Sequence, residues 1–351
     1  MRGNGGPDPL RRKLARATLS DVAKAAGVSV MTVSNFVHAK PVRLKTRKLV
    51  EAAIARLNYR PNVSARSLRL SQEYSVGIVI ADSDPEYLND PFISRLVSGL
   101  SNYLSSLDYT LDVQGVAPER FENATILSKV GNEALCAILC GPKSLRKEQF
   151  AYLNRLGQPI VVFRETFQPL TPNMAVVSQD DLSGGKQLGQ HLLKKRPRSV
   201  LFVRPALGWS AVEQREKGLR GALEAASPAI DVKTLIASSE RFDDVQQVVG
   251  DYLAKRTPDA IVGATDSMAA AALKACEHVG IRVPKDLWLA GFNGFDVWRH
   301  TSPTITTVIS PAYEMGRRAG ELLIGRLQNG EFAKRRVVLP VRLQIGESTA
   351  R

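Results

Sequence analysis

Residues 18–70 read TLSDVAKAAGVSVMTVSNFVHAKPVRLKTRKLVEAAIARLNYRPNVSARSLRL. A first helix is predicted over 21–26. It stops at Gly27, a residue that often ends helices because it adopts left-handed backbone angles without strain. Ser29 is placed to cap a second helix over 30–37, since its hydroxyl can accept a hydrogen bond from an amide of the first turn. Two short helices joined by such a turn predict a helix-turn-helix, whose second helix enters the major groove of DNA.

Small apolar side chains give this segment a core of its own. The residues expected between the first two helices are Val22, Ala23, Ala26, Val28, Val33 and Val37. A third amphipathic helix is predicted over 45–57. The residues on its apolar face, which would close the core, are Leu49, Ala52, Ala53, Ile54 and Leu57. Residues 17–61 are therefore expected to form an all-α headpiece.

The excess positive charge of the chain is concentrated in the same region. The 351 residues carry a formal net charge of +14. Residues 1–72 contain 15 Lys and Arg against 3 Asp and Glu, a net charge of +12, whereas the rest of the chain has 33 against 31, a net charge of +2. A small basic module that carries a reading helix is typical of a DNA-binding protein, because Lys and Arg neutralise phosphates.

Composition excludes several other classes of function. No apolar run approaches the roughly 20 residues that span a membrane. The basic, Gly/Pro-rich start, 1–16, lacks the apolar stretch of a secretory signal. We expect it to be a disordered tail that either contacts phosphates or is only solvated. Cys136, Cys140 and Cys276 lack metal-binding spacing and fit inert core thiols in a reducing cytoplasm. The four histidines are scattered singly, so no metal, cofactor or catalytic site is predicted.

From Ser75 onward, short apolar runs alternate with helical patterns such as 93–107. The predicted strands are 76–82, 110–115, 134–140, 159–164, 199–205, 233–238, 259–265 and 287–293. Two successive series of this kind predict an α/β core of two Rossmann-like lobes with parallel sheets. Ligands of such sheets bind at the carboxyl ends of the strands, which here means a cleft between the lobes.

The stretches LSDVAKAAGVS, MTVSN and LNYRPN…ARSL within 18–70 resemble the DNA-binding headpiece and hinge of the lactose-repressor (LacI/GalR) family. The resemblance extends to about Leu339 and includes the family's periplasmic-binding-protein-like core. The stretches that carry it there are 90–94, 176–193, 214–223, 265–293 and 302–323. It implies a transcription regulator controlled by a small effector, most often a repressor in this family.

The resemblance also implies how the chain is divided. The segments are a disordered basic tail (1–16), the helix-turn-helix headpiece (17–61), a hinge helix and linker (62–74) and an effector-binding and dimerisation core (75–351). Within the core, the N-lobe takes about 75–176 and 305–335, and the C-lobe takes about 177–304 and 336–351. The chain is therefore expected to cross between the lobes more than once.

The family's DNA-reading residues carry over by position. Val30 and Met31 fall on its variable base contacts, and Asn35 falls where the family usually has Arg. The residues that fall on phosphate contacts are Thr18, Thr32 and Ser34. Apolar side chains can contact a thymine methyl group, and Asn can pair with adenine. The alternative for Val30 and Met31 is simple packing in the headpiece core.

Residues 62–69 resemble the family's hinge helix, which folds on operator DNA. Leu68 matches the leucine that the family inserts into the minor groove, where an apolar wedge partly unstacks a base step. The residues that match the frame around it are Asn62, Ala65 and Arg66. Two helical turns are too short to be stable alone in water, and the alternative is an ordinary linker.

The same resemblance gives the candidate effector site. The matching residues are Phe92 and Ile93 in the N-lobe, Arg164 and Glu165 at a strand end, and Arg215, Asp266 and Asn293 in the C-lobe. Arg215 is expected to contact the ligand, because its only sequence neighbours with carboxylates, Glu213 and Glu216, point elsewhere on a helix. Carboxylates, amides and guanidinium groups suit a hydroxyl-rich ligand.

Two departures from the family bear on the charge of the ligand. The family usually has Asp at positions 164 and 293, where this chain has Arg164 and Asn293. Trading negative for positive charge favours an anionic ligand such as a sugar acid, and GFNGFD, at 291–296, resembles the gluconate-repressor branch. The alternative is that Arg164 faces solvent or pairs with Glu165.

Two other classes of protein share parts of this pattern. A periplasmic-type sugar-binding transport protein needs a signal peptide and no headpiece, and an α/β enzyme with a DNA module needs a catalytic constellation; the sequence predicts neither. We therefore expect a non-enzymatic, cytoplasmic, nucleoid-associated bacterial regulator that binds double-stranded operator DNA and a sugar or sugar acid, without a membrane partner. A homodimer is expected, because one headpiece reads only a half-site and no heptad segment follows the core.

Overall fold

The computed structural model of this chain describes residues 17–37, 41–57, 59, 75–82, 86–129, 133–139, 147–163, 170–206, 208–226 and 230–350. The chain forms two compact units, Met1–Glu73 and Tyr74–Arg351. The smaller unit is helical and the larger is α/β with parallel sheets, so the predicted fold class is confirmed. The predicted tail, 1–16, and the predicted hinge helix, 62–69, lie outside the described residues.

The described part of the smaller unit, the headpiece, consists of α2 (Leu19–Ala26), α3 (Val30–Val37) and α4 (Leu44–Leu57). Gly27 ends α2 with a left-handed φ of +65°, so the chain turns toward α3 at the predicted residue. Every residue predicted between α2 and α3 lies in the core, and Val22 and Val33 are fully buried. The predicted face of α4 is wrong at Leu49 and Ala52, which are both exposed, because Val50 and Ala53 take the buried positions of this helix.

The first lobe of the larger unit contains a parallel six-stranded sheet in the order β11-β5-β4-β3-β1-β2. Its strands are β1 (Ser75–Ala81), β2 (Thr110–Val116), β3 (Ala134–Leu139), β4 (Ile160–Phe163), β5 (Met174–Gln179) and β11 (Arg336–Leu339). Its helices are η1 (Tyr87–Asn89), α6 (Pro91–Ser105), η2 (Pro118–Asn123), α7 (Thr125–Ser128), α8 (Lys147–Arg155) and α14 (Ala312–Asn329). One face packs on α6 and α14, and the other packs on η2, α7 and α8.

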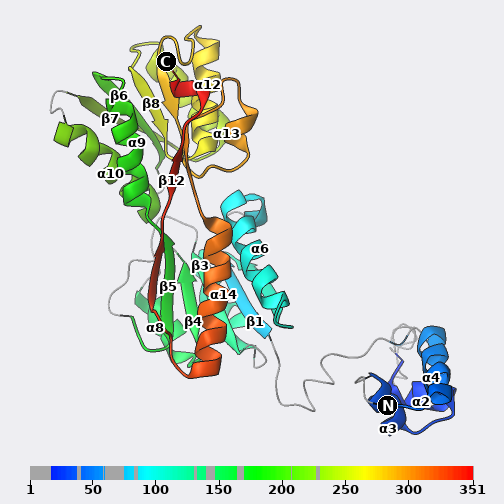
Figure 1. The fold of residues 1–351 in the computed structure, drawn as a ribbon. Coiled ribbons are helices and arrows are strands. Elements are labelled where there is room, and N and C mark those ends of the chain that lie inside the picture. Colours follow the sequence, from blue (N-terminus) through cyan, green and yellow to red (C-terminus); the bar gives the residue numbers. More distant parts are fainter. Residues whose placement is uncertain are drawn as a thin grey trace, which may run out of the picture. The chain divides into compact units, whose positions relative to one another are not determined.

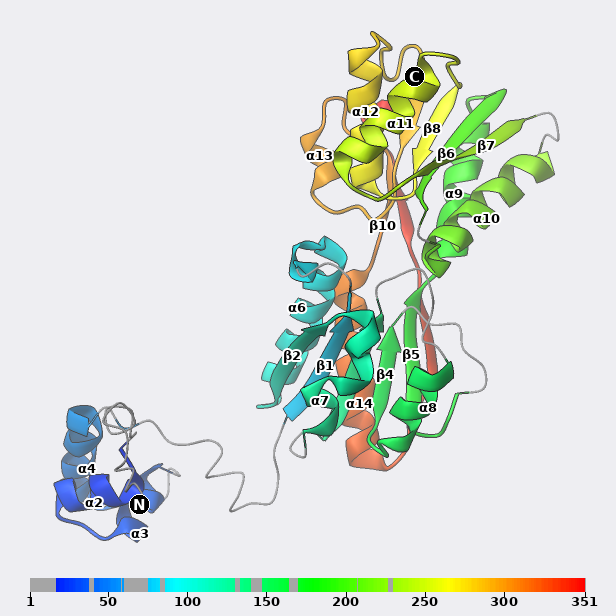
Figure 2. The ribbon, with the colours of Figure 1, turned by 180° about the vertical axis from the view of Figure 1, so that it is seen from behind.

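The second lobe contains a parallel four-stranded sheet in the order β7-β6-β8-β9. Its strands are β6 (Ser199–Pro205), β7 (Asp231–Ala237), β8 (Ala260–Gly263) and β9 (Trp288–Ala290). Its helices are α9 (Asp181–Leu193), α10 (Ser210–Ala226), α11 (Phe242–Leu253), α12 (Asp266–His278), α13 (Val297–His300) and η3 (Glu347–Thr349). α9 packs against α10 and α11 against α12, and these two pairs flank the sheet (Figure 2).

The chain crosses between the lobes three times in its described part (Figure 1). The crossings lie between β5 and α9, between β10 (Thr307–Ile309) and α14, and between β11 and β12 (Arg342–Gln344). The predicted lobe boundaries need correction at three places. Residues 305–309, which include β10, belong to the second lobe, because Ile305 and Val308 pack in its core. β5 continues past 176 to Gln179, and β11 pairs with β5, so 336–339 belongs to the first lobe. β11 and β5 are far apart in the sequence, so sequence order did not reveal that they pair at the edge of the sheet.

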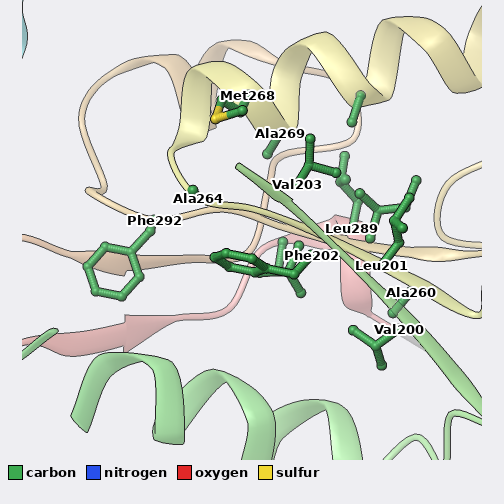
Figure 3. Close-up of a cluster of buried hydrophobic side chains, with 14 of the residues drawn as sticks. Val200, Leu201, Phe202, Val203, Ala260, Ala264, Met268, Ala269, Leu289 and Phe292 are labelled. Atoms are coloured by element: carbon green, nitrogen blue, oxygen red, sulfur yellow. The ribbon is translucent and has the colours of Figure 1, made fainter. Parts of the chain in front are cut away.

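Burial of the strands fixes the strand ends that later carry polar residues. All seven residues of β1 are buried, as expected for a strand covered on both faces. In the second lobe, Phe202 and Val203 of β6 pack in one cluster with Met268 and Leu289, and Phe292 lies at its edge (Figure 3). Each fully buried side chain of this size contributes roughly 1.5–3 kcal/mol to stability. The carboxyl ends of the strands are therefore held rigidly.

Candidate functional site

The second helix of the headpiece, α3, begins at a hydrogen-bonded cap. Ser29 Oγ accepts a hydrogen bond from Thr32 N at 3.1 Å and lies 2.8 Å from Thr32 Oγ1. The bond satisfies one of the amides that a helix start leaves unpaired. It confirms the predicted cap and fixes the first turn of α3. The Thr32 hydroxyl, predicted to contact phosphate, lies in this same turn.

Val30 and Met31 project from that first turn into solvent. Their side chains are 42% and 69% exposed, whereas Val33, on the same helix, is fully buried. The alternative of core packing for Val30 and Met31 is therefore wrong. Two exposed apolar side chains at the start of a helix-turn-helix second helix are placed to contact thymine methyl groups.

Thr18 caps α2. Its hydroxyl donates to Asp21 Oδ2 at 2.7 Å, its backbone amide donates to the same oxygen at 2.8 Å, and its Oγ1 accepts from Asp21 N at 3.2 Å. These hydrogen bonds hold the pKa of Asp21 below its ordinary value. Ser34 and Asn35 are half-buried on α3. The other predicted DNA contacts lie outside the described residues: Asn62, Ala65, Arg66 and Leu68.

The described headpiece is basic at its surface. Six cationic side chains are all exposed: Lys24, Arg43, Lys45, Arg47, Lys48 and Arg56. The described acidic residues of the headpiece are Asp21 and Glu51. This excess of positive charge suits a polyphosphate partner, because each neutralised phosphate releases a condensed counterion.

The larger unit has a cleft of about 500 Å³ between its two lobes. Its walls come from carboxyl ends of strands in both sheets, the position where parallel sheets bind ligands. Residues of the first lobe that line it include Asp82, Tyr87, Asp90 and Phe92. Residues of the second lobe that line it include Pro205, Trp209, Arg215, Asp266, Asn293 and Phe295. The cleft is large enough for a small polar ligand.

The structure brings together four of the seven predicted effector residues. Phe92, Arg215, Asp266 and Asn293 all line the cleft. Ile93 does not: its side chain is fully buried in the core of the first lobe, because it lies on the face of α6 that carries Leu96 and Leu100 against the sheet. Ile93 is therefore wrong as a side-chain contact. Arg164 and Glu165 lie outside the described residues.

Arg215 is a buried, paired side chain at the base of the cleft. Its Nε donates to Asp181 Oδ1 at 2.8 Å, and its Nη1 donates to the carbonyl oxygen of Ala264 at 2.8 Å. Its guanidinium carbon lies 3.9 Å from the ring centroid of Phe292. The expectation that no carboxylate pairs with Arg215 is wrong, because α9 packs against α10 and brings Asp181 to it from 34 residues away.

Asp266 is the most deeply buried carboxylate in the cleft lining. Its Oδ1 accepts from Thr307 Oγ1 at 2.6 Å, and its Oδ2 accepts from Gly294 N at 2.7 Å. Burial raises the pKa of Asp266 to about 7, although these hydrogen bonds and the charge of Arg215 oppose the rise. Asp266 therefore both lines the cleft and anchors β10, the strand that precedes the second crossing.

Asn293 has an unusual backbone and an unsatisfied side chain. Its φ is +108°, a backbone conformation that residues other than glycine seldom adopt. Its backbone is held by hydrogen bonds to Val308 and from Ser310, and its Oδ1 is buried without a hydrogen-bond partner. A ligand hydroxyl that donates a hydrogen bond to Asn293 Oδ1 would satisfy this buried oxygen.

Sequence reasoning missed several residues of the cleft. Asp181 and Trp209 are the most informative, since one pairs with Arg215 and the other adds an aromatic wall. A signal for Asp181 was present, because the pair Asp180 and Asp181 follows an apolar strand-like run. Among the described lining residues, five carboxylates (Asp82, Glu86, Asp90, Glu240 and Asp266) face two guanidinium groups (Arg215 and Arg241).

Within the described residues, no group of three or more His, Cys, Asp and Glu side chains is arranged to hold a metal ion. In the same part of the chain, every helix is too short or too polar to cross a membrane.

Comparison with known families gives two matches. Residues 18–62 match the model of bacterial regulatory proteins of the lacI family, and residues 190–349 match a periplasmic binding protein-like domain. Among curated proteins, the chain is 27% identical to the ribose operon repressor of Halalkalibacterium halodurans over 95% of this chain and 97% of that protein. It is 29% identical to the HTH-type transcriptional regulator CelR of Thermobifida fusca, over 95% and 98%.

Solved structures give the same result over nearly the whole chain. A complex of the transcriptional regulator CelR with cellobiose has a TM-score of 0.69 and 26% identity, and the match covers 95% of this chain and all of that one. The lac repressor bound to ONPG in its repressed state has a TM-score of 0.79 and 25% identity, with 95% and 99% covered.

Proposed function

We propose that the chain is a repressor of the lacI family of bacterial regulatory proteins, which binds operator DNA through its headpiece and is controlled by a small ligand in its cleft. The observation that carries the proposal is that one chain combines a reading helix whose Val30 and Met31 are exposed with a polar cleft at the strand ends of two lobes. We assign the cleft a binding role and no reaction.

The proposed effector is a sugar. The chain is similar to ribose operon repressors and to a CelR solved with cellobiose, and the cleft offers carboxylate, amide and guanidinium groups that suit adjacent hydroxyls. The resemblance of GFNGFD to the gluconate-repressor branch keeps a sugar acid as the second candidate. The four carboxylates of the described lining other than Asp266 outnumber its two guanidinium groups, which favours the neutral sugar over the acid.

The proposed DNA complex is a homodimer on a near-palindromic operator, formed in the cytoplasm and associated with the nucleoid. Each headpiece would read one half-site, with Val30, Met31 and Asn35 at base edges. The proposed phosphate contacts are Thr18, Thr32 and Ser34. The proposed hinge residues are Asn62, Ala65, Arg66 and Leu68, with Leu68 as the minor-groove wedge.

Selection of random DNA duplexes by the full chain tests DNA recognition. We expect enrichment of one near-palindromic site, because two headpieces related by a twofold axis read inverted half-sites. Leu68→Ala should weaken binding of that site strongly and leave ligand affinity unchanged. If no DNA sequence is enriched, the proposed DNA function is contradicted. If Leu68→Ala binds the selected DNA site as tightly as the unmodified protein does, residues 62–69 are an ordinary linker.

A thermal-shift screen of the full chain tests the cleft. The panel comprises neutral sugars, sugar acids, polyols and purines. A ligand that binds only the folded state raises the melting temperature by mass action, by an amount that grows with its concentration. We expect a neutral sugar to do so and to change operator affinity in a gel-shift titration. A ligand that stabilises the protein without any effect on operator binding would contradict the regulatory role.

A further inference from the structure

The charge of Arg215 is cancelled within the protein. Asp181 and Arg215 are both nearly fully buried, with 9% and 5% of their surfaces exposed, and their ion pair is made at 2.8 Å. A buried guanidinium that faces a carboxylate at this distance presents little net positive charge to a ligand. Asp266 lies near enough to Arg215 to interact with it electrostatically.

Asp181 is itself held in place from both lobes. Gln179, at the end of β5, donates from Nε2 to Asp181 Oδ1 at 2.8 Å, and Ser310 donates to Gln179 Oε1 at 2.5 Å. The helices that carry the ion pair are also fixed, because a side chain at Gly185 would collide with the backbone of Arg215 and one at Gly218 with the backbone of Leu182. The pair is therefore a built feature of the cleft base.

Of the three guanidinium nitrogens of Arg215, one has no acceptor in the described part of the chain and is left for a ligand. Nε and Nη1 are occupied by Asp181 and Ala264, and among the described residues nothing accepts a hydrogen bond from Nη2. The residue lines the cleft. Nη2 can donate to the hydroxyl oxygens of a neutral ligand, whereas a carboxylate gains most from a guanidinium whose charge no other carboxylate compensates.

From this geometry we propose that Asp181 is the residue that sets the ligand class. By pairing with Arg215, it makes the cleft select a neutral polyhydroxy ligand and reject a carboxylate. The inference rests on the proposed function of the cleft as an effector site. It predicts that removal of the Asp181 charge alone converts the site into one that accepts sugar acids.

The test compares binding of D-gluconate and D-glucuronate to the full chain with and without the Asp181 charge. Asp181→Asn keeps an oxygen that can accept from Arg215 Nε and Gln179 Nε2, so it changes charge and little else. In calorimetric titration, the association constant of at least one of the two acids should be at least tenfold higher for this variant than for the unmodified protein. D-Glucose, titrated in parallel, should show a smaller change.

Asp180→Asn is the matched control, because it removes the same charge one residue away. Asp180 Oδ1 accepts from Ser183 N at 2.9 Å and does not contact Arg215, and Asn caps a helix as well as Asp does. This variant should bind the acids no better than the unmodified protein. An equal gain in both variants would mean that the effect is general electrostatics, and would overturn the proposal.

A second variant covers the case in which Asp181→Asn is too unstable to titrate. Asp181→Ser leaves space beside Arg215, and acetate is the probe because it can restore the missing carboxylate. Acetate should raise the melting temperature of this variant, relative to chloride at equal ionic strength, and should not raise that of the unmodified protein.

The outcomes separate the two proposals. If neither acid nor acetate binds better without the Asp181 charge, or if the unmodified protein already binds the acids as tightly as Asp181→Asn does, the role of Asp181 is overturned. If the variants gain acid binding while no neutral sugar of the wider panel binds the unmodified protein, Asp181 keeps its role and the neutral sugar effector of the proposed function fails.

Discussion

The headpiece and the cleft place their candidate functional residues in opposite ways. In α3, Val30 and Met31 are exposed and take no part in the core that Val22 and Val33 form. In the cleft, Arg215 and Asp266 are among the most buried polar groups of the larger unit, and each makes hydrogen bonds that hold distant segments together. Stability and recognition should therefore be separable in the headpiece and coupled in the cleft.

The physical reason lies in the ligand that each region takes. A duplex is read from outside, so the reading side chains must stand clear of the helix that carries them. A small ligand must be surrounded, and polar groups around it are desolvated and need partners when the site is empty. Asp181 and Thr307 provide such partners for Arg215 and Asp266.

The largest effect is expected for Arg215→Met. This change leaves Asp181 buried without its cation, and breaking a buried ion pair in this way costs roughly 3–5 kcal/mol. All three tryptophans, Trp209, Trp288 and Trp298, lie in the second lobe, so urea unfolding followed by tryptophan fluorescence reports on this loss. Ligand response should disappear in the same variant, while operator binding by folded protein should remain.

Arg282→Met is the control for that prediction. Arg282 is in the same lobe and pairs with Asp286 at 2.9 Å, but its side chain is 63% exposed. Breaking an exposed pair costs much less stability than breaking a buried one. If both variants lose the same stability, burial of the Arg215 pair does not have the energetic weight assigned to it.

The next largest effect is a pH dependence from Asp266. Burial raises the pKa of Asp266 to about 7, so in the folded protein it keeps a proton that the unfolded chain releases near pH 4. Stability from this group is therefore highest below about pH 4 and is lost as the pH rises toward 7. When the pH is lowered from 8 to 5, the free energy of unfolding of the unmodified protein should rise on the order of 2 kcal/mol more than that of Asp266→Asn, as measured by urea unfolding. A difference that is constant with pH would contradict the raised pKa.

The sequence predicted the elements better than the contacts between them. Apolar runs located eight of the twelve strands in the described part of the chain, whereas β5, β10, β11 and β12 were not predicted. Arg215 was assigned to the cleft, but its partner Asp181 was missed, since only helix packing brings these two residues together. Ile93 was misassigned for the converse reason: its neighbour Phe92 lines the cleft, and adjacent helix positions face different directions. Strand β11 was placed in the wrong lobe because its pairing is nonlocal.

In the headpiece, Val33→Ala should change stability and leave recognition intact. Val33 is fully buried, and removing two methyl groups from a packed core costs about 2 kcal/mol. Hydrogen exchange of α2–α4 amides in the full chain measures that loss. Val30→Ala is the control, because its side chain is 42% exposed and should lose less than about 0.5 kcal/mol. Operator affinity extrapolated to fully folded protein should be unchanged in Val33→Ala, and a specific loss there would show that the two properties are coupled after all.

The smallest effect on stability, and the sharpest test of the comparison, is expected for Met31→Ala. Met31 is 69% exposed, so its removal should change the free energy of unfolding by less than about 0.5 kcal/mol. If its side chain contacts a thymine methyl group, operator affinity should fall about tenfold, equivalent to ~1.4 kcal/mol, and only on duplexes that carry the contacted base pair. Leu49→Ala removes another exposed apolar side chain from α4, outside the reading helix, and should leave operator affinity unchanged. Gel-shift titrations at fixed salt compare the three proteins, because phosphate contacts make every affinity depend on salt. An equal loss for Met31→Ala and Leu49→Ala would mean that exposed apolar residues of the headpiece act nonspecifically, and would remove α3 as the source of base recognition.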